Sequence, residues 1–260
     1  MMENRIFEKR VLFLSLVLFT VSCSTRPSSS VRCGREELVT IPLGHTTAYL
    51  LRGEKTILID TGNPGDGEKI LERFDKLGIP REEISLIILT HNNIDHAGSA
   101  AMLKEKLVVP LAVHEADAPN LRLGTNIGTA RSAFGKVFAA LTHVKTLTPC
   151  EPDFYLSDGM SLEAYGVDAK IVHTPGHTPG SITLLLPSGE AIAGDLIFAD
   201  FPFSVRKPGE PMFCDDPGLA RESIRKLLNR SPKIIYVAHG GPFKPEDVNE
   251  YLEKKENKSD

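Results

Sequence analysis

Short apolar runs and longer amphipathic stretches alternate along most of the chain. The apolar runs have the length of strands, are rich in isoleucine, leucine and valine, and stop at glycine, proline or aspartate. They predict strands over residues 37–43, 47–51, 55–60, 84–89, 108–113, 161–164, 169–172, 181–186, 190–194 and 233–238. The amphipathic stretches predict helices over residues 68–77, 98–107, 217–228 and 245–254, with residues 118–144 helical in pieces because glycines interrupt them.

The strand-rich pattern occurs twice, and in each half an aspartate stands where a strand stops after a hairpin. These aspartates are Asp60 in the first half and Asp195 in the second. The repetition suggests that the halves are related by duplication. The economical architecture is two mixed β-sheets packed face to face with helices outside, an α+β fold of the four-layer αββα sandwich type.

The first residues have the pattern of an export signal rather than of a folded domain. Arg5, Lys9 and Arg10 form a positive segment, and residues 11–21 form an apolar run that is too short to span a bilayer as a helix. A cysteine, Cys23, follows this run. The segment resembles the signal of a bacterial lipoprotein, in which cleavage occurs before the cysteine and the cysteine receives the lipid. Ordinary secretion with cleavage nearby and an uncleaved anchor are the alternatives.

The chain is therefore expected to contain a signal peptide at 1–22, a tether at 23–36, a folded domain at 37–255 and a frayed tail at 256–260. The expected location is that of an exported bacterial lipoprotein, anchored to the membrane through its N-terminus and facing the periplasm or the cell surface. Beyond Cys23, the cysteines Cys33, Cys150 and Cys214 are scattered and odd in number. We expect buried thiols, with at most one disulfide among them.

Composition narrows the range of partners. Of the 260 residues, 41% are hydrophobic and 25% are charged, which is ordinary for a globular protein with one sizeable core. The net charge of -4 gives no basic surface of the kind that duplex nucleic acid requires. We therefore expect no nucleic-acid partner.

One stretch, residues 90–98, concentrates the groups that carry chemistry. It contains His91, Asn93, Asp95 and His96, and it lies between the predicted strand 84–89 and the predicted helix that follows. Open α/β architectures place ligands at the carboxyl ends of strands, and folding alone does not require so many coordinating groups there. The stretch is therefore the first candidate for a functional site.

Three further coordinating side chains follow other predicted strands, namely His177, Asp195 and His239. Nitrogen and oxygen donors of these types bind zinc and similar ions, and loops at strand ends can converge on one point. Each residue also has a simpler interpretation when taken alone. A single histidine after a strand is usually hydrogen-bonded or at the surface, Asp195 can cap a helix, and the glycine- and proline-rich loop around His177 can be only a stiff connection.

The order of these motifs along the chain and the residues in each resemble those of the metallo-β-lactamase superfamily. The series is IDTG, THNNIDHAG, HTPGHTPGS, AGD and AHGGPF, and the resemblance covers about residues 39–252. The family pattern is HxHxDH, a later His, an Asp and a last His. The resemblance implies the αββα fold and a hydrolase with a two-metal site.

The resemblance also implies a role for each matching residue. The implied ligands are His91 and His177 for the first ion, Asp95, His96 and His239 for the second, and Asp195 as a bridge between them. Asp60 is implied to support the site without binding metal, although its position in the sequence also fits a turn residue. His173, four residues before His177, is not an implied ligand and is expected to support the ligands at most.

Asn93 departs from the family pattern, which has its second histidine at this position. A carboxamide oxygen is a poorer zinc ligand than an imidazole, so the first site would keep only His91, His177 and the shared Asp195. We predict one firmly bound Zn²⁺ in the second site and a weak or absent ion in the first. Other divalent metals can replace zinc in such a donor set.

The resemblance implies hydrolysis of a small ester, thioester or lactone by a metal-bound hydroxide, with Asp95 orienting the nucleophile or taking its proton. The alternatives are a degenerate member that binds metal or ligand without hydrolysis, and a two-iron redox member. The loop at residues 201–208 is expected to flank the pocket, where its phenylalanines would suit an apolar acyl group and Arg206 or Lys207 a carboxylate. A surface loop without a role in binding is an equal alternative.

Overall fold

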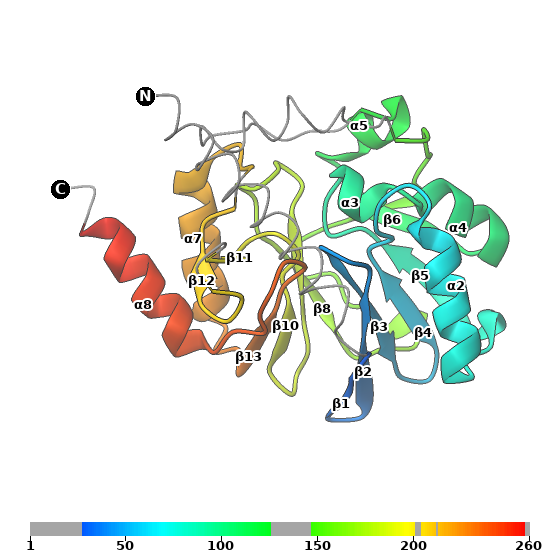
Figure 1. The fold of residues 1–260 in the computed structure, drawn as a ribbon, viewed down its shortest axis with the longest axis horizontal. Helices are drawn as coiled ribbons and strands as arrows, with labels where there is room; N and C mark the ends of the chain where they lie inside the picture. The colour runs from blue at the N-terminus through cyan, green and yellow to red at the C-terminus, as the bar shows by residue number, and fades with distance from the viewer. Residues whose placement is uncertain (1–27, 126–146, 201–203, 212, 258–260) are drawn as a thin grey trace, which may run out of the picture.

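The computed structural model describes residues 28–125, 147–200, 204–211 and 213–257 of the chain. In these residues two β-sheets face each other, and helices cover the outer face of each sheet (Figure 1). The predicted α+β four-layer αββα sandwich is confirmed. Residues 1–22, Cys23 and most of the predicted helical region 118–144 lie outside the described residues.

The larger sheet has its strands in sequence order. They are β1 (Ser30–Cys33), β2 (Glu36–Pro42), β3 (Thr47–Arg52), β4 (Thr56–Ile59), β5 (Ile84–Ile88), β6 (Leu111–His114) and β7 (Phe154–Leu156). Neighbouring strands are antiparallel from β1 to β4 and parallel from β4 to β7. The helices α2 (Asp66–Leu77), α4 (Ala100–Leu107) and α5 (Ala118–Leu123) follow β4, β5 and β6. The carboxyl ends of β4, β5 and β6 therefore share one edge of the sheet.

The smaller sheet has the order β13 (Ile234–Tyr236), β10 (Glu190–Ile192), β9 (Ile182–Leu185) and β8 (Lys170–His173). β10 and β13 are parallel, so their carboxyl ends also share an edge. The helices α7 (Pro217–Leu228) and α8 (Pro245–Glu256) lie outside this sheet, and β11 (Phe198–Ala199) pairs with β12 (Pro208–Gly209) beside it (Figure 1).

Three hydrophobic cores separate the four layers. On β5, Leu86 and Ile88 pack between the two sheets, whereas Ile87 packs in the core under α2 and α4. The same alternation on β10 places Ile192 between the sheets and Ala191 in the core under α7 and α8. Side chains alternate across a strand, so a strand that is buried on both faces reads as a continuous apolar run.

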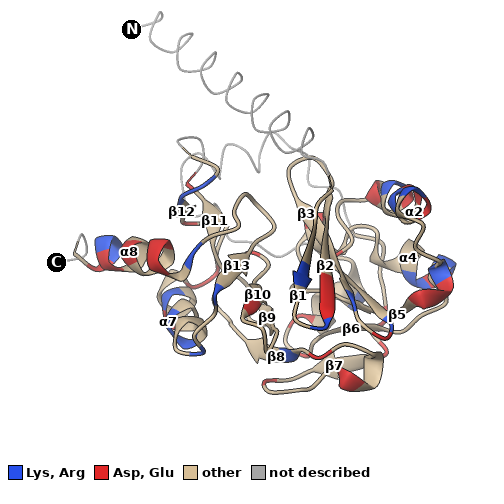
Figure 2. Cartoon of the chain, turned by 90° about the horizontal axis from the view of Figure 1, so that it is seen from below, with Lys and Arg blue, Asp and Glu red and all other residues tan. Residues whose placement is uncertain are grey.

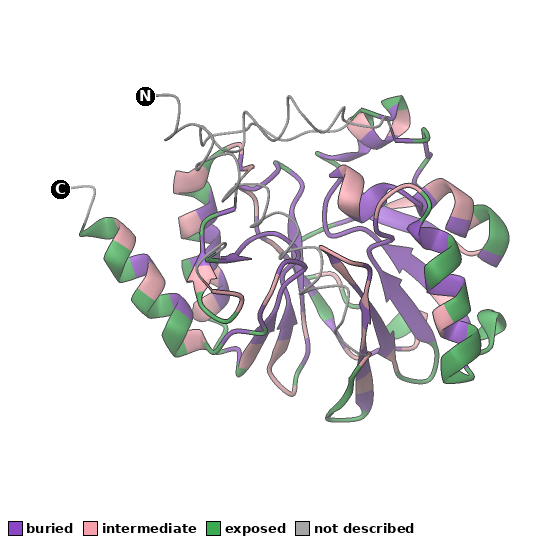
Figure 3. Cartoon of the chain, in the orientation of Figure 1, coloured by how far each residue is buried: buried purple, intermediate pink, exposed green. Residues whose placement is uncertain are grey.

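Burial and charge follow the layers. The strands are buried along most of their length, and the outer helices are buried only on the side that faces a sheet (Figure 3). Lys, Arg, Asp and Glu gather on the helices α2, α4, α7 and α8 (Figure 2). None of the helices in the described ranges is long and apolar enough to cross a membrane.

Several elements differ from the sequence predictions. The strand expected over 161–164 is wrong: Ser161 makes only an isolated bridge to Lys170, and the chain then turns through the 3-10 helix η2 (Glu163–Tyr165). After this turn, the carbonyl of Gly166 accepts a hydrogen bond from the amide of Glu54 in the β3–β4 hairpin, at 2.8 Å. Part of the tether expected over 23–36 is instead strand β1, which begins at Ser30.

Two further boundaries moved. The helix expected over 98–107 begins only at Ala100 as α4, because Ser99 lies outside helical geometry, and a separate short helix that was not expected, α3 (Ile94–Ala97), precedes it. The strand expected over 108–113 begins at Leu111, since Val108 has a left-handed backbone (φ 55) that ends α4. The three cysteines that the structure describes are all buried, as expected, and none is joined to another in a disulfide.

Candidate metal centre

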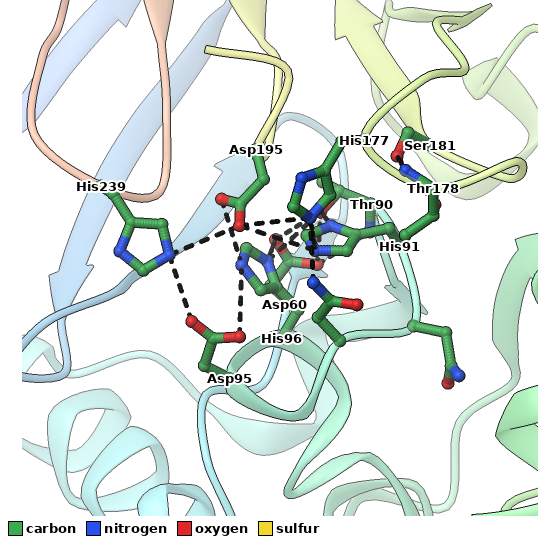
Figure 4. Close-up of polar contacts among 12 residues, drawn as sticks. Asp60, Thr90, His91, Asp95, His96, His177, Thr178, Ser181, Asp195 and His239 are labelled. Atoms are coloured by element: carbon green, nitrogen blue, oxygen red, sulfur yellow. Dashed lines mark hydrogen bonds and ion pairs between the residues drawn. The ribbon is translucent and has the colours of Figure 1, made fainter. Parts of the chain in front are cut away.

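The edge where the two sheets meet brings together every predicted ligand (Figure 4). The contributing segments are Asp60 after β4, residues 91–96 after β5, His177 between β8 and β9, Asp195 after β10 and His239 after β13. The amide of Ile182, the first residue of β9, donates to the carbonyl of Thr90 at 2.9 Å and joins the sheets at this point. Chain topology thus assembles the site from both sheets.

One group of donors comprises Asp95, His96, Asp195 and His239, whose candidate ligand atoms lie within 4.8 Å of one another. His96 Nε2 lies 3.2 Å from Asp195 Oδ1, and His239 Nε2 lies 3.1 Å from Asp95 Oδ2. Two carboxylates and two imidazoles in this arrangement supply four donors to one ion. This is the predicted second site.

A second group comprises His91, His177 and the same Asp195. The Nε2 atoms of the two imidazoles are 3.1 Å apart, and they lie 3.7 Å and 3.6 Å from Asp195 Oδ2. Asp195 therefore stands between the two groups and can bridge them. This is the predicted first site, with three donors.

The second group is oriented by hydrogen bonds to the far side of its imidazoles. His96 Nδ1 donates to Asp60 at 2.8 Å, and His239 Nδ1 donates to the carbonyl of His45 at 2.8 Å. Both rings thereby direct Nε2 into the site, which is the usual arrangement for histidines that bind metal. Asp60 also accepts from the backbone amide and the hydroxyl of Thr90, each at 2.8 Å, and so supports the loop that carries His91.

Charges in the second group shift the pKa values strongly. Burial alone would lower the pKa of His96, but Asp195, Asp60 and Asp95 raise it well above its usual value. Burial likewise opposes protonation of His239, yet Asp195 and Asp95 raise its pKa to about 10. The same contacts outweigh burial at Asp95 and Asp195 and hold the pKa of each carboxyl below its usual range. Without metal, two imidazolium ions thus face two carboxylates at neutral pH.

The first group has the opposite character. Burial and the neighbouring imidazole of His96 lower the pKa of His91, and burial is also the main cause that lowers the pKa of His177. Both rings are therefore neutral at pH 7. Two neutral imidazole nitrogens 3.1 Å apart require a shared proton or a cation between them, because two lone pairs at that distance repel.

The unpartnered polar atoms test whether a metal ion fits. Within the described residues, His96 Nε2 and Asp195 Oδ1 are buried, and although they lie 3.2 Å apart, neither forms a hydrogen bond of acceptable angle. Buried polar atoms are normally satisfied, so their convergence on one point indicates a missing cation. The donor set of imidazole and carboxylate suits zinc, iron and similar divalent ions. The residues present therefore fit a divalent metal ion.

Asn93 lies beside the first group, where the sequence comparison placed it. Its Nδ2 donates to His177 Nε2 at 2.9 Å, and its buried Oδ1 has no hydrogen-bond partner in the described ranges. Asn93 is not among the residues that form either group of donors. The first group accordingly has three donors, which are two imidazoles and Asp195, whereas the second group has four donors.

Some predicted residues lie outside the two groups. His173 stacks on His114 with ring centroids 3.9 Å apart, and its Nε2 is 3.0 Å from the carbonyl of Pro179. It therefore packs against the loop that carries His177 and is not one of the donors. Phe201 and Phe203 lie outside the described residues.

Sequence reasoning missed two contributors to the site. Phe198 has its ring centroid 4.3 Å from that of His239 and 6.3 Å from that of His177, so it forms an apolar wall beside both groups. The backbone carbonyl of His45 orients His239. The apolar run ending at Phe198 was a usable signal for the first, whereas a backbone carbonyl leaves no signal in a sequence.

Comparison with known proteins identifies the family. Residues 41–239 match the sequence model of the metallo-beta-lactamase superfamily. The chain belongs to the metallo-beta-lactamase superfamily. A probable metallo-hydrolase of Methanocaldococcus jannaschii is 32% identical over 154 residues, which are 59% of this chain and 68% of that protein.

Two other similar proteins are informative. The hydroxyacylglutathione hydrolase GloC of Haemophilus influenzae is 27% identical over 194 residues, covering 72% of this chain and 80% of that protein. The solved structure of TTHA1623 in a di-iron-bound form is 28% identical, covers 80% of this chain and 94% of its own, and superposes with a TM-score of 0.59. The chain is thus similar to metallo-hydrolases over most of its folded part.

Proposed function

We propose that this metallo-beta-lactamase superfamily member is a metal-dependent hydrolase of a small ester, thioester or lactone. The observation that carries the proposal is the complete donor group of Asp95, His96, Asp195 and His239, gathered at the edge of both sheets. Among the three substrate classes, the name of the relative GloC supports a thioester, because a hydroxyacyl group joined to glutathione is one. We propose zinc as the native metal, and the di-iron form of TTHA1623 makes iron the alternative.

The donor group, Asp95 and Phe198 would have different roles in this reaction. A divalent ion bound here would lower the pKa of a coordinated water and polarise the substrate carbonyl. Asp95 is the most accessible donor, with 20% of its side chain exposed against 0% for His96 and 1% for Asp195, so its carboxylate can accept a hydrogen bond from the attacking water and orient it. Phe198 places an apolar surface beside both groups, against which an acyl chain can pack.

A substrate panel tests the proposal. Purified protein is assayed with generic esters, thioesters, lactones and β-lactams, and its metal content is measured. We expect turnover of at least one class, with Asp95→Ala and Asp195→Ala each lowering kcat/KM by about 10²-fold or more. Asp158→Asn, which alters a surface carboxylate bonded to the amide of His173, is the matched control and should retain activity. A metal-loaded, folded protein that turns over none of the four classes would refute hydrolysis.

A degenerate, non-hydrolytic member is the second candidate, and Asn93 favours it. The first group has no third imidazole, so the chain can bind metal and ligand without supporting the reaction. Saturable ligand binding by the metal-loaded protein, without product formation, would establish this second candidate.

We also propose that the chain is an exported lipoprotein anchored through Cys23. The support is the positive segment, the apolar run at 11–21 and the cysteine that follows it. In a bacterial host, labelled palmitate should be incorporated into the wild-type chain and not into Cys23→Ser. Equal labelling of both chains, or none of either, would refute the anchor.

A further inference from the structure

Asp117 is a buried carboxylate that the proposed reaction does not use. It is fully buried and stands at the N-terminus of α5, directly after β6. An aspartate at that position normally caps the helix with its side chain. Here, in the described part of the chain, its carboxylate makes no such cap. The side chain points instead toward the two loops that carry the first donor group.

Three donors from these loops converge on Asp117. Oδ2 accepts from the backbone amide of Asn92 at 3.0 Å and from the hydroxyl of Thr178 at 2.8 Å, and Oδ1 accepts from the backbone amide of Gly180 at 2.8 Å. Asn92 is the residue after His91, and Thr178 is the residue after His177. One carboxylate therefore ties together the neighbours of both imidazoles of the first group.

The contacts require a carboxylate and a close approach. All three partners donate, and an ionised carboxylate is the side chain that only accepts. A Cβ added to Gly180 would lie 2.5 Å from Cγ and Oδ1 of Asp117, so the glycine permits this approach. Ser181 completes the arrangement, because its hydroxyl accepts from the amide of Thr178 at 3.0 Å and donates to the hydroxyl of Thr178 at 2.8 Å, which holds the Thr178 side chain in place.

We propose that Asp117 is a positioning residue that sets the separation and direction of His91 and His177, and thereby controls the first donor group without touching the second. Asp60 is its counterpart, since it holds His96 of the second group directly. The effect on the positions of the imidazoles is measured in the metal-free protein, whereas the effect on metal binding rests on the proposed metal-dependent function.

The decisive variant is Asp117→Asn, with Asp153→Asn as the matched control. Asp153 also accepts a distant backbone amide, that of Leu111, but at the start of β6 rather than beyond its end. In the metal-free proteins, NMR is used to follow the imidazole resonances and the exchange of the Asn92 and Gly180 amides. We expect Asp117→Asn to shift His91 and His177 and to speed exchange of both amides.

The same spectra should leave His96 and His239 unchanged in Asp117→Asn and all four imidazoles unchanged in Asp153→Asn. Unshifted His91 and His177 in Asp117→Asn would overturn the proposal, and so would equal shifts of all four rings. If Asp117→Asn does not fold, Thr178→Val removes one donor and Thr178→Ser retains it. The valine variant should reproduce the selective shifts, and the serine variant should restore the wild-type spectrum.

A Zn²⁺ titration by calorimetry adds the metal readout, with Asn93→His as the background in which the first group gains an imidazole. Asp117→Asn should weaken binding of the ion in the first group by about 10- to 100-fold and leave binding of the ion in the second group within about twofold of the parent. An equal loss of affinity for both ions in Asp117→Asn would overturn the proposal that Asp117 controls the first donor group alone. If no variant binds metal, the proposed function fails, and the metal-free spectra still decide the role of Asp117.

Discussion

At the scale of single residues, we expect Asn93 to limit the number of ions that the site can hold. Its amide donates to His177 Nε2, the atom that a first ion would need. A carboxamide donor at this point competes with a cation for the same lone pair. We therefore expect Asn93 to weaken metal binding by the first group in two ways. It supplies no imidazole, and its amide occupies the lone pair of His177 Nε2.

Replacement of Asn93 by histidine should raise the metal content. We expect about one equivalent of tightly bound metal in the wild-type protein and about two in Asn93→His, because the variant supplies a third imidazole to the first group. Metal analysis after dialysis against metal-free buffer measures both values. Asn93→Ala removes the amide without adding a ligand and should stay near one equivalent. Two tightly bound equivalents in the wild type would contradict the prediction.

The candidate ligands could be predicted from the sequence, and so could Asp60, which orients His96, whereas the other residues that orient them could not. His91, Asp95, His96, His177, Asp195 and His239 stand out because their chemistry is unusual at strand ends. Asp117 has no such signal, since aspartate before a helix is ordinary and only the tertiary structure reveals that its carboxylate faces two loops. The carbonyl of His45 is a backbone atom and is invisible to any sequence pattern.

At the scale of elements, prediction succeeded where one element carries its own pattern. Helix α7 was predicted with its observed bounds, because a proline and an N-terminal aspartate begin it and the apolar spacing is helical throughout. Strand β1 was missed because it is an exposed edge strand that reads as polar linker. Strand β7 has only three residues and depends on its parallel partner β6, which lies about forty positions earlier.

The core between the sheets should be the most sensitive to truncation. Ile88 on β5 is fully buried there, and Ile88→Ala should lower the free energy of unfolding by about 2–5 kcal/mol through lost burial and the cavity left behind. Urea denaturation measures the change. Leu123→Ala, at a position with 70% of the residue exposed, should stay within about 0.5 kcal/mol of wild type. Equal effects of the two variants would contradict this assignment of the core.

At the scale of the whole molecule, the site couples metal binding to protons. His239 has a pKa of about 10 and His96 a pKa well above its usual value, so both rings carry a proton at pH 7 that must leave before Nε2 can bind an ion. A folded pKa above the unfolded value stabilises the metal-free protein below about pH 6.5, and the contribution of His239 is lost as pH rises through about 10.

Metal loading should therefore release protons. We expect about two protons per ion in the second group at pH 7, and an apparent affinity that increases as the pH rises toward 10. Calorimetry in buffers that differ in ionisation enthalpy measures the number released. No dependence on buffer at pH 7 would show that both imidazoles are already neutral in the metal-free protein.

The origin of the ligands in both sheets fixes an order of events. His96 and Asp95 come from one sheet, and Asp195 and His239 come from the other, so no ion can be held by four donors until the sheets have docked. Once the sheets are together and before a metal ion binds, the imidazolium ions of His96 and His239 neutralise the carboxylates, which would otherwise repel each other. A metal ion that displaces these two protons would link the two sheets after they have docked, and its binding free energy would add to the stability of the contact between them.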